Sequence, residues 1–130
     1  MKNLIVVVSL FLSVAAYSQT KEAAEIDNTI YASVDKMAEF PGGIGAFRNE
    51  FAKNVSTKKI KQKGVFRTEV TFVVEKDGTI SEVKAVGQNA DFNQAALAAM
   101  KKITTKWNPG KKDDVPVRYR FRFPAALNVD

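Results

Sequence analysis

"GVFRTEVTFVVEKDGTISEVKAV", residues 64–86, places apolar residues at alternate positions, the period of a β-strand with one buried and one exposed face. Asp77 and Gly78 follow the first run, and both residue types tolerate the positive φ of a tight hairpin turn. Residues 80–86 return to the same period, which predicts a β-hairpin. Its first strand is expected to divide its side chains between two faces: Phe66, Val70, Phe72 and Val74 against Arg67, Glu69, Thr71 and Glu75.

A second stretch with a period of two is "VPVRYRFRF", residues 115–123. Its basic and apolar rows alternate: Arg118, Arg120 and Arg122 with Val117, Tyr119, Phe121 and Phe123. This pattern predicts another strand with one wet and one dry face. The basic row could be neutralised within the sheet by Glu69 and Glu75. It could also bind a protein partner or an acidic polymer, and the pattern alone leaves these three interpretations open.

Two segments have the spacing of an amphipathic helix. After turn residues around Pro41, apolar residues at spacings of three and four predict a helix over residues 43–54: Ile44, Phe47, Phe51 and Val55. The second helix follows candidate caps at Asn89 and Asp91, and its apolar stripe covers three turns: Phe92, Ala95, Ala96, Ala99, Met100 and Ile103. Asn108-Pro109-Gly110 is expected to stop this helix.

The predicted order is helix, strand, strand, helix, strand. We therefore expect an α+β fold in which a small antiparallel or mixed three-stranded sheet carries two helices on one face. If the strand at residues 115–123 lies antiparallel beside the first hairpin strand, it forms an edge of the sheet.

The first residues have the pattern of a secretory signal. Lys2 precedes a short apolar run over residues 4–14, and small side chains at Ala16 and Ser18 fit a signal peptidase site. We expect cleavage after Ser18 and export to the periplasm, without stable membrane insertion. An uncleaved anchor is the alternative, although the apolar run is shorter than a typical membrane span.

These observations divide the chain into four parts. They are a signal peptide at residues 1–18, a short leader or tether at 19–34, the folded domain at 35–126 and a tail at 127–130.

The composition excludes most enzyme chemistry. None of the 130 residues is Cys or His, which removes thiolate nucleophiles, imidazole bases, disulfides and Cys/His zinc sites. Asp113-Asp114 has no nucleophile beside it. The turn formed by Phe40, Pro41, Gly42 and Gly43 lacks the Lys-Ser/Thr ending of a phosphate-binding loop. We predict neither an enzyme, nor a cofactor, nor a bound metal.

Three motifs, in this order and spacing, resemble the TonB C-terminal domain family as it occurs in Bacteroidetes-type bacteria. The motifs are "EFPGGIGAF" (39–47), "GVFRTEVTFVVEKDGTISEVKAV" (64–86) and "KWNPGKKDDVPVRYRFRFP" (106–124), and the resemblance covers about residues 35–126. It implies structural roles for Phe40, Pro41, Gly42, Gly43, Asp77, Gly78, Trp107, Pro109 and Gly110. Without a histidine or a proline-rich spacer, the chain is similar to a stand-alone exported form rather than to a full energy transducer.

The resemblance also implies a function. Domains of this family grip the N-terminal segment of an outer-membrane transporter, which the last strand accepts as an added strand. Here that strand corresponds to residues 116–123, and the implied partner-binding residues are Arg118, Tyr119, Arg120, Phe121 and Arg122. The implied partner is a protein rather than a nucleic acid, and pairing of two copies through the same edge is a further possibility.

A second class of function stays open from the sequence. The net charge is +6, and "KKIKQK" (58–63) could attract peptidoglycan or lipopolysaccharide. The chain would then be a basic envelope-polymer binder or structural domain that keeps the fold without the transducer role. Trp107, next to the Pro109-Gly110 turn, is expected to pack against the core rather than bind a ligand.

Overall fold

The computed structural model describes residues 27–130. Its helices are α2 (Ile44–Asn54) and α3 (Ala90–Lys102), and its strands are β1 (Ile30–Tyr31), β2 (Gly64–Val74), β3 (Ile80–Gly87), β4 (Gly110–Lys112) and β5 (Val115–Val129). The predicted signal peptide and the first part of the predicted leader lie outside the described residues. The α+β class and the predicted element order are confirmed, with two short strands in addition.

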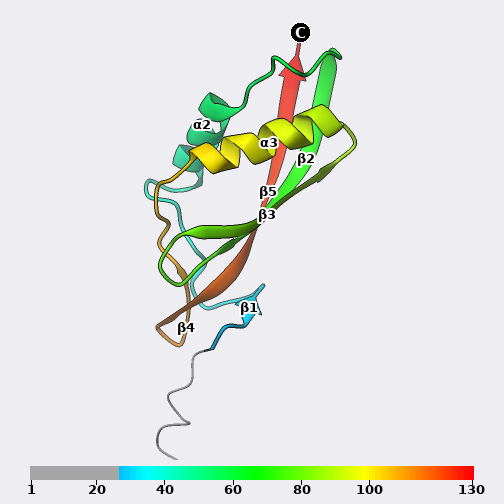
Figure 1. Ribbon diagram of the computed structural model, residues 1–130. Helices are drawn as coiled ribbons and strands as arrows, with labels where there is room; N and C mark the ends of the chain where they lie inside the picture. The colour runs from blue at the N-terminus through cyan, green and yellow to red at the C-terminus, as the bar shows by residue number, and fades with distance from the viewer. Residues whose placement is uncertain (1–26) are drawn as a thin grey trace, which may run out of the picture.

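The sheet has the order β1-β5-β2-β3, and β4 also pairs with β5 (Figure 1). β2 and β5 run antiparallel in register from Gly64 opposite Val129 to Val74 opposite Tyr119. The predicted pairing of the last strand with the first hairpin strand is therefore confirmed. The prediction of only three strands is wrong, because β1 and β4 are too short to show a period in the sequence. β5 is also longer than the predicted strand and includes residues 127–129 of the predicted tail.

The β2–β3 turn follows the expected chemistry. Gly78 has a φ of +87°. Its N–H donates to the carbonyl of Glu75 at 2.9 Å, and the Asp77 carboxylate accepts from the N–H of Thr79 at 3.0 Å. These bonds satisfy the backbone at the tip of the hairpin, so the turn holds the strand register that the alternating pattern requires.

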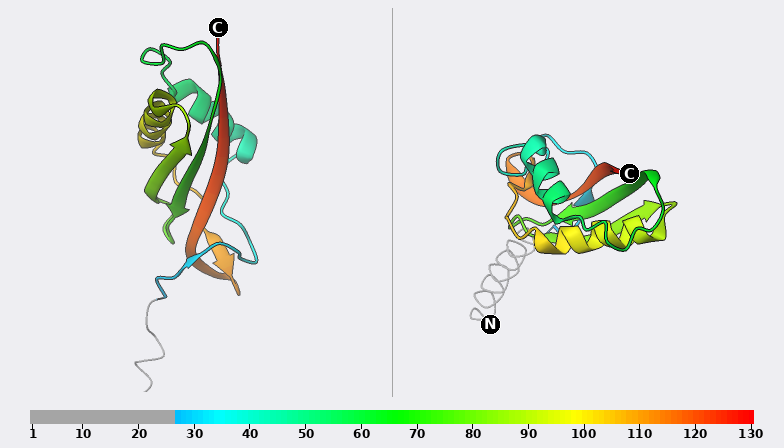
Figure 2. Two further views of the ribbon diagram at one scale, coloured as in Figure 1. Left: turned by 90° about the vertical axis from the view of Figure 1, so that its right-hand side faces the viewer. Right: turned by 90° about the horizontal axis from the view of Figure 1, so that it is seen from above.

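Both helices lie on the same face of the twisted sheet and enclose the core (Figures 1 and 2). Alternate side chains of β2 and β5 enter this core, as the period of two predicts: Val70, Phe72, Val74, Tyr119, Phe121 and Phe123. Trp107 lies among four phenylalanines, with ring centroids 5.0 Å from those of Phe47 and Phe121. The interior is therefore dominated by aromatic edge-to-face contacts.

The helices differ from the prediction in the exposure of one residue and in the end of α3. The spacing predicts Ile44 on the buried stripe of the first helix, but Ile44 is the first residue of α2 and is exposed, and the buried residues of the helix are Phe47 and Phe51. α3 ends at Lys102 instead of continuing toward Asn108. The β-branched residues Ile103, Thr104 and Thr105 follow, and such residues favour extended backbone. Asn89 caps α3 as predicted, since its side-chain oxygen accepts from the N–H of Phe92 at 2.8 Å.

Candidate functional site

The edge of β5 is only partly open, which corrects the simple edge position expected from the sequence. β1 pairs in parallel with its first half, aligning Ile30 with Arg118 and Tyr31 with Tyr119. β4 pairs with the first three residues of β5. Beyond Tyr119, β5 has β2 on one side and no paired strand on the other among residues 27–130. The candidate edge therefore begins at Arg120.

Two prolines indicate which backbone groups face this edge. Pro116 and Pro124 both lie within β5, and their positions differ by an even number. Successive residues of a strand direct their N–H and C=O groups to opposite sides, so these two share one side. A proline within a sheet normally turns its missing N–H toward an open edge. Arg120 and Arg122 have the same parity, so their N–H and C=O groups face the open side.

The side chains of Tyr119 and Phe121 are not available to a partner. They are only 6% and 9% exposed, and Phe121 stacks on Phe72 with ring centroids 5.3 Å apart. Burial raises the pKa of Tyr119. The two residues that the resemblance implies for binding thus belong to the core, which leaves the arginines of β5 and the backbone to face a partner.

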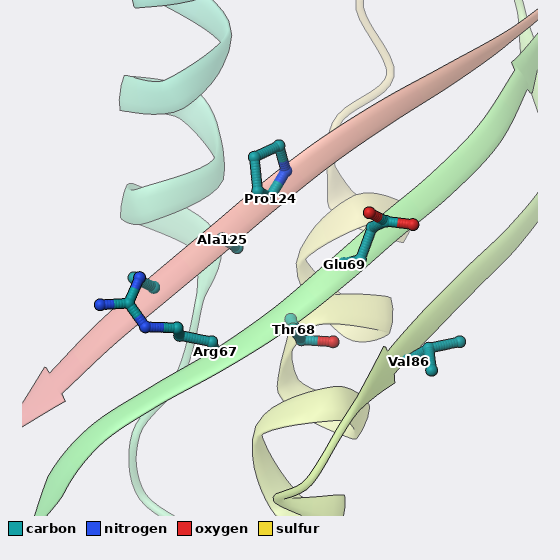
Figure 3. A pocket seen from close by; sticks show the side chains of 7 residues that line it. Arg67, Thr68, Glu69, Val86, Pro124 and Ala125 are labelled. Atoms are coloured by element: carbon teal, nitrogen blue, oxygen red, sulfur yellow. The ribbon is translucent and has the colours of Figure 1, made fainter.

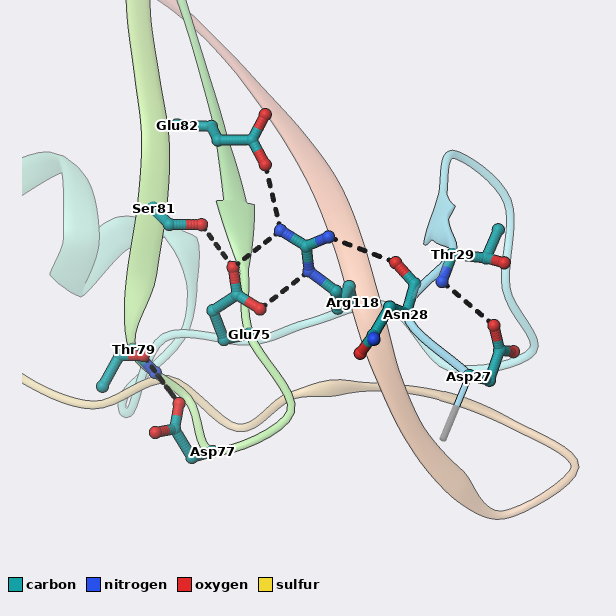
Figure 4. A network of polar contacts seen from close by, with 9 residues as sticks. All are labelled: Asp27, Asn28, Thr29, Glu75, Asp77, Thr79, Ser81, Glu82 and Arg118. Carbon is teal, nitrogen blue, oxygen red and sulfur yellow. Dashed lines mark hydrogen bonds and ion pairs between the residues drawn. The ribbon is translucent and has the colours of Figure 1, made fainter. Parts of the chain in front are cut away.

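Arg118 is held by contacts within the chain (Figure 4). Its guanidinium donates to both carboxylate oxygens of Glu75, at 2.8 and 3.1 Å, and to Glu82 at 2.9 Å. A further N–H reaches the carbonyl of Asn28 at 3.1 Å. The hydrogen bonds from Arg118, with a smaller contribution from the Ser81 hydroxyl, lower the pKa of Glu75. The charge of Arg118 is therefore neutralised within the sheet, by Glu75 and Glu82.

The other two arginines of the row are in different situations. Arg122 forms an exposed ion pair with Glu69 at 3.2 Å. Arg120 lies opposite the buried Val73 of β2 and forms no ion pair in the part of the chain that the structure describes. Within residues 27–130, the row is therefore neutralised at Arg118 and Arg122, whereas Arg120 has no ion-pair partner. Arg67, on β2, likewise has no ion-pair partner among the described residues.

A shallow hollow of about 180 Å³ lies beside the start of the open edge. Its lining includes Tyr119, Arg120, Phe121 and Arg122, which the resemblance implies for partner binding, together with Ala32 and Met37. Met37 is 57% exposed. Ala32 and Met37 could not be predicted from the sequence, because the segment that contains them shows no period and no motif.

Another hollow, of about 250 Å³, lies on the helix-free face of the sheet, where Figure 3 shows the strands in front of the helices. It is lined by Arg67, Glu69, Val86, Pro124 and neighbouring residues. The basic connector lies elsewhere: Lys58, Lys59, Lys61 and Lys63 are all exposed, while Ile60 between them is buried. The structure thus separates the lysine-rich connector from the arginine row of β5.

Two of the motif residues, Phe40 and Trp107, belong to the core rather than to the open edge. The backbone N–H of Trp107 donates to the carbonyl of Gly78 at 2.9 Å, and Glu39 and Asn108 exchange two backbone hydrogen bonds. The ring of Phe40 lies 5.3 Å from that of Trp107.

Each of the remaining motif residues fits this framework. The Pro41-Gly42 turn is closed by a 2.7 Å bond from the N–H of Gly43 to the carbonyl of Phe40. A Cβ at Gly110 would stand 3.0 Å from Cβ of Tyr119, so its lack of a side chain lets β4 pack against β5. Pro109 is half-buried between Trp107 and Gly110. Gly110 thus lies against β5, whereas the Pro41-Gly42 turn leads into α2.

Comparisons with known proteins identify the family. The model of the Gram-negative bacterial TonB protein C-terminal family matches residues 57–126, which includes β2, β3, α3, β4 and most of β5. No curated protein and no solved structure gives a significant match. Within residues 27–130, no helix is long and apolar enough to cross a membrane.

The matched region spans more than half of the chain and contains two of the three motifs that carried the resemblance; "EFPGGIGAF" precedes it. Domains of this family serve energy transduction or binding in the cell envelope and are not enzymes. This chain belongs to the family of Gram-negative bacterial TonB protein C-terminal domains.

Proposed function

We propose that the chain is a periplasmic binding module that accepts an extended segment of another envelope protein as an added strand on the open edge of β5. The observation that carries this proposal is the pairing of β5, which has β2 on one side and no strand on the other beyond Tyr119 among the described residues. By resemblance, the partner is the N-terminal segment of an outer-membrane transporter.

The chemistry of the edge suits strand addition. The outward N–H and C=O groups of Arg120 and Arg122 supply the donors and acceptors that an extended chain needs. The buried side chains of Phe121 and Phe123 fix the strand from the core side. Pro124 interrupts the row of donors, so the added strand gains the most hydrogen bonds beside Arg120 and Arg122.

We further propose that the chain reaches the periplasm through cleavage after Ser18. The positive, apolar and small-residue pattern of residues 1–18 supports this, together with the envelope role of the family. Intact mass measured on soluble and membrane fractions tests it. A soluble species that begins at Gln19 supports cleavage, whereas a membrane-bound species that retains Met1 contradicts it.

Site-specific photo-cross-linking in living bacteria tests the binding function. A photoreactive p-benzoylphenylalanine in place of Met37 stands beside the open edge without altering the arginines. The same group in place of Lys101, exposed on α3, is the control. Strand addition predicts a cross-link from position 37 to the N-terminal segment of an outer-membrane transporter, and none from position 101.

Two results would contradict the proposal. Identical products from positions 37 and 101 would indicate contacts that do not depend on the edge. Adducts with peptidoglycan or lipopolysaccharide, and no transporter, would favour the envelope-polymer function, for which the exposed lysines at 58, 59, 61 and 63 would be the first residues to replace.

A further inference from the structure

We propose that the segment which adds to β5 is acidic, with a carboxylate side chain placed against Arg120. This inference rests on the proposed strand addition and specifies the chemistry of the partner.

Arg118 shows how an arginine of this row meets a chain that lies along the edge. Its guanidinium extends across the edge and donates to the carbonyl of Asn28, which directly precedes β1 (Figure 4). Arg118, Arg120 and Arg122 are alternate residues of one strand, so their side chains project from the same face. A chain that lies beside β5 beyond β1 therefore comes within reach of Arg120.

Arg120 is the member of the row that has no neutralising partner among the described residues. Arg118 is surrounded by Glu75 and Glu82, whereas Arg120 has the aliphatic Val73 across the ladder. No carboxylate lies within 4 Å of its guanidinium among residues 27–130.

An added strand would change the environment of this guanidinium. It would remove water from one side of Arg120, and a desolvated guanidinium needs new acceptors for its N–H groups. A carboxylate can accept two of these bonds at once and balance the charge. A neutral amide satisfies fewer of them, and a lysine would repel the arginine.

Neighbouring residues define the rest of the segment. Arg122 already has Glu69 as an exposed partner, so a second acid two residues along would compete with Glu69 and add less. Ala32 and Met37 give the hollow an apolar wall, which fits an apolar neighbour of the acid. A second copy of this chain fits poorly, because an antiparallel pair centred on Phe121 would bring Arg120 against Arg122 of the copy.

Fluorescence anisotropy with synthetic peptides tests the inference. The probes are three labelled peptides of the pattern Thr-Val-X-Val-X-Val-Thr, with X as Glu, Gln or Lys. They are titrated against the intact chain, Arg120→Gln, and Arg67→Gln as a matched control that removes the same charge from β2, away from the edge. A Glu peptide N-methylated at alternate backbone nitrogens reports whether binding uses strand hydrogen bonds.

The expected result has three parts. The Glu peptide binds about fivefold more tightly than the Gln peptide, which corresponds to about 1 kcal/mol for one charge pair. Arg120→Gln removes this preference, and Arg67→Gln keeps it. Arg120→Glu reverses the preference in favour of the Lys peptide.

The opposing results separate the inference from the proposed function. Equal binding of the Glu and Gln peptides, abolished by N-methylation, would overturn the acidic preference and leave strand addition intact. A preference for Glu that survives N-methylation, or that Arg67→Gln reduces as much as Arg120→Gln does, would show binding by overall charge and overturn both. Absence of binding by every peptide would also count against both.

Discussion

The backbone N–H of Trp107 donates a 2.9 Å hydrogen bond to the carbonyl of Gly78, which joins the tip of the β2–β3 hairpin to the segment that leads into β4. A Cβ at Gly78 would stand 2.2 Å from the carbonyl oxygen of Trp107. Gly78 therefore serves two purposes: it adopts the positive φ of the turn, and it allows a second backbone to approach closely.

Gly78→Val should destabilise the fold strongly. The strained φ alone costs about 1–3 kcal/mol in a non-glycine residue, and the clash with Trp107 adds to this cost. Urea unfolding followed by tryptophan fluorescence measures the change. Gly45→Ala is the matched control, because Gly45 lies in α2 with open space around it, and alanine there should stabilise the helix by about 0.5–1 kcal/mol. Equal stability of Gly78→Val and the parent chain would contradict the turn described here.

Phe121→Asp should unfold the domain or destabilise it by at least about 3 kcal/mol. The substitution removes a buried aromatic ring that stacks on Phe72 and places a charge in the core. Arg120→Ala, one residue away on the opposite face, should cost less than about 1 kcal/mol through lost cover over Val73. Thermal unfolding measures the loss of stability in both variants. A larger loss for Arg120→Ala than for Phe121→Asp would show that Arg120, and not Phe121, faces the core.

The parts of the fold that a simple period describes could be predicted from the sequence. Val70, Phe72 and Phe121 follow a period of two, and their burial required no other information. β1 could not be predicted, because a two-residue strand has no period and depends on partners that are distant in sequence. Arg118 contacts Asn28 across the fold, for example, although 90 positions separate them.

The candidate site, too, could be predicted only in part from the sequence. Alternation showed that the three arginines of β5 share a face, but not which of them is neutralised. That difference depends on register: Glu75 and Glu82 approach Arg118, whereas Val73 stands opposite Arg120. Met37 lies next to the edge because its neighbours Lys36 and Glu39 pair with Lys111 and Asn108, which are distant in sequence.

The Arg118–Glu75 pair should make stability depend on pH in the acid range. Arg118 holds the pKa of Glu75 below its ordinary value of 4.5, so the folded state binds this proton more weakly than the unfolded state. The stabilisation is therefore complete above the unfolded pKa and is lost as the pH falls through the lower folded pKa. Glu75→Gln removes this contribution.

Urea unfolding at a series of pH values from about 6 to about 3 measures the effect. Glu75→Gln should be less stable than the parent at the upper end, and the two should converge as the pH falls. Glu39→Gln, which removes a carboxylate that forms no ion pair among the described residues, is the matched control for the loss of one negative charge. Parallel curves for the parent and Glu75→Gln would contradict the role assigned to the pair.

Amide hydrogen exchange should reveal the open edge directly in the free chain. Phe121 and Phe123 direct their N–H groups toward β2 and should exchange slowly, whereas Arg120 and Arg122 direct theirs to the open side and should exchange much faster. Arg118 has the same parity but lies beside β1, so its amide should be better protected than that of Arg120. NMR-detected exchange gives each rate separately. Uniform protection from Arg118 to Phe123 would show that this edge is already covered and would remove the basis for strand addition.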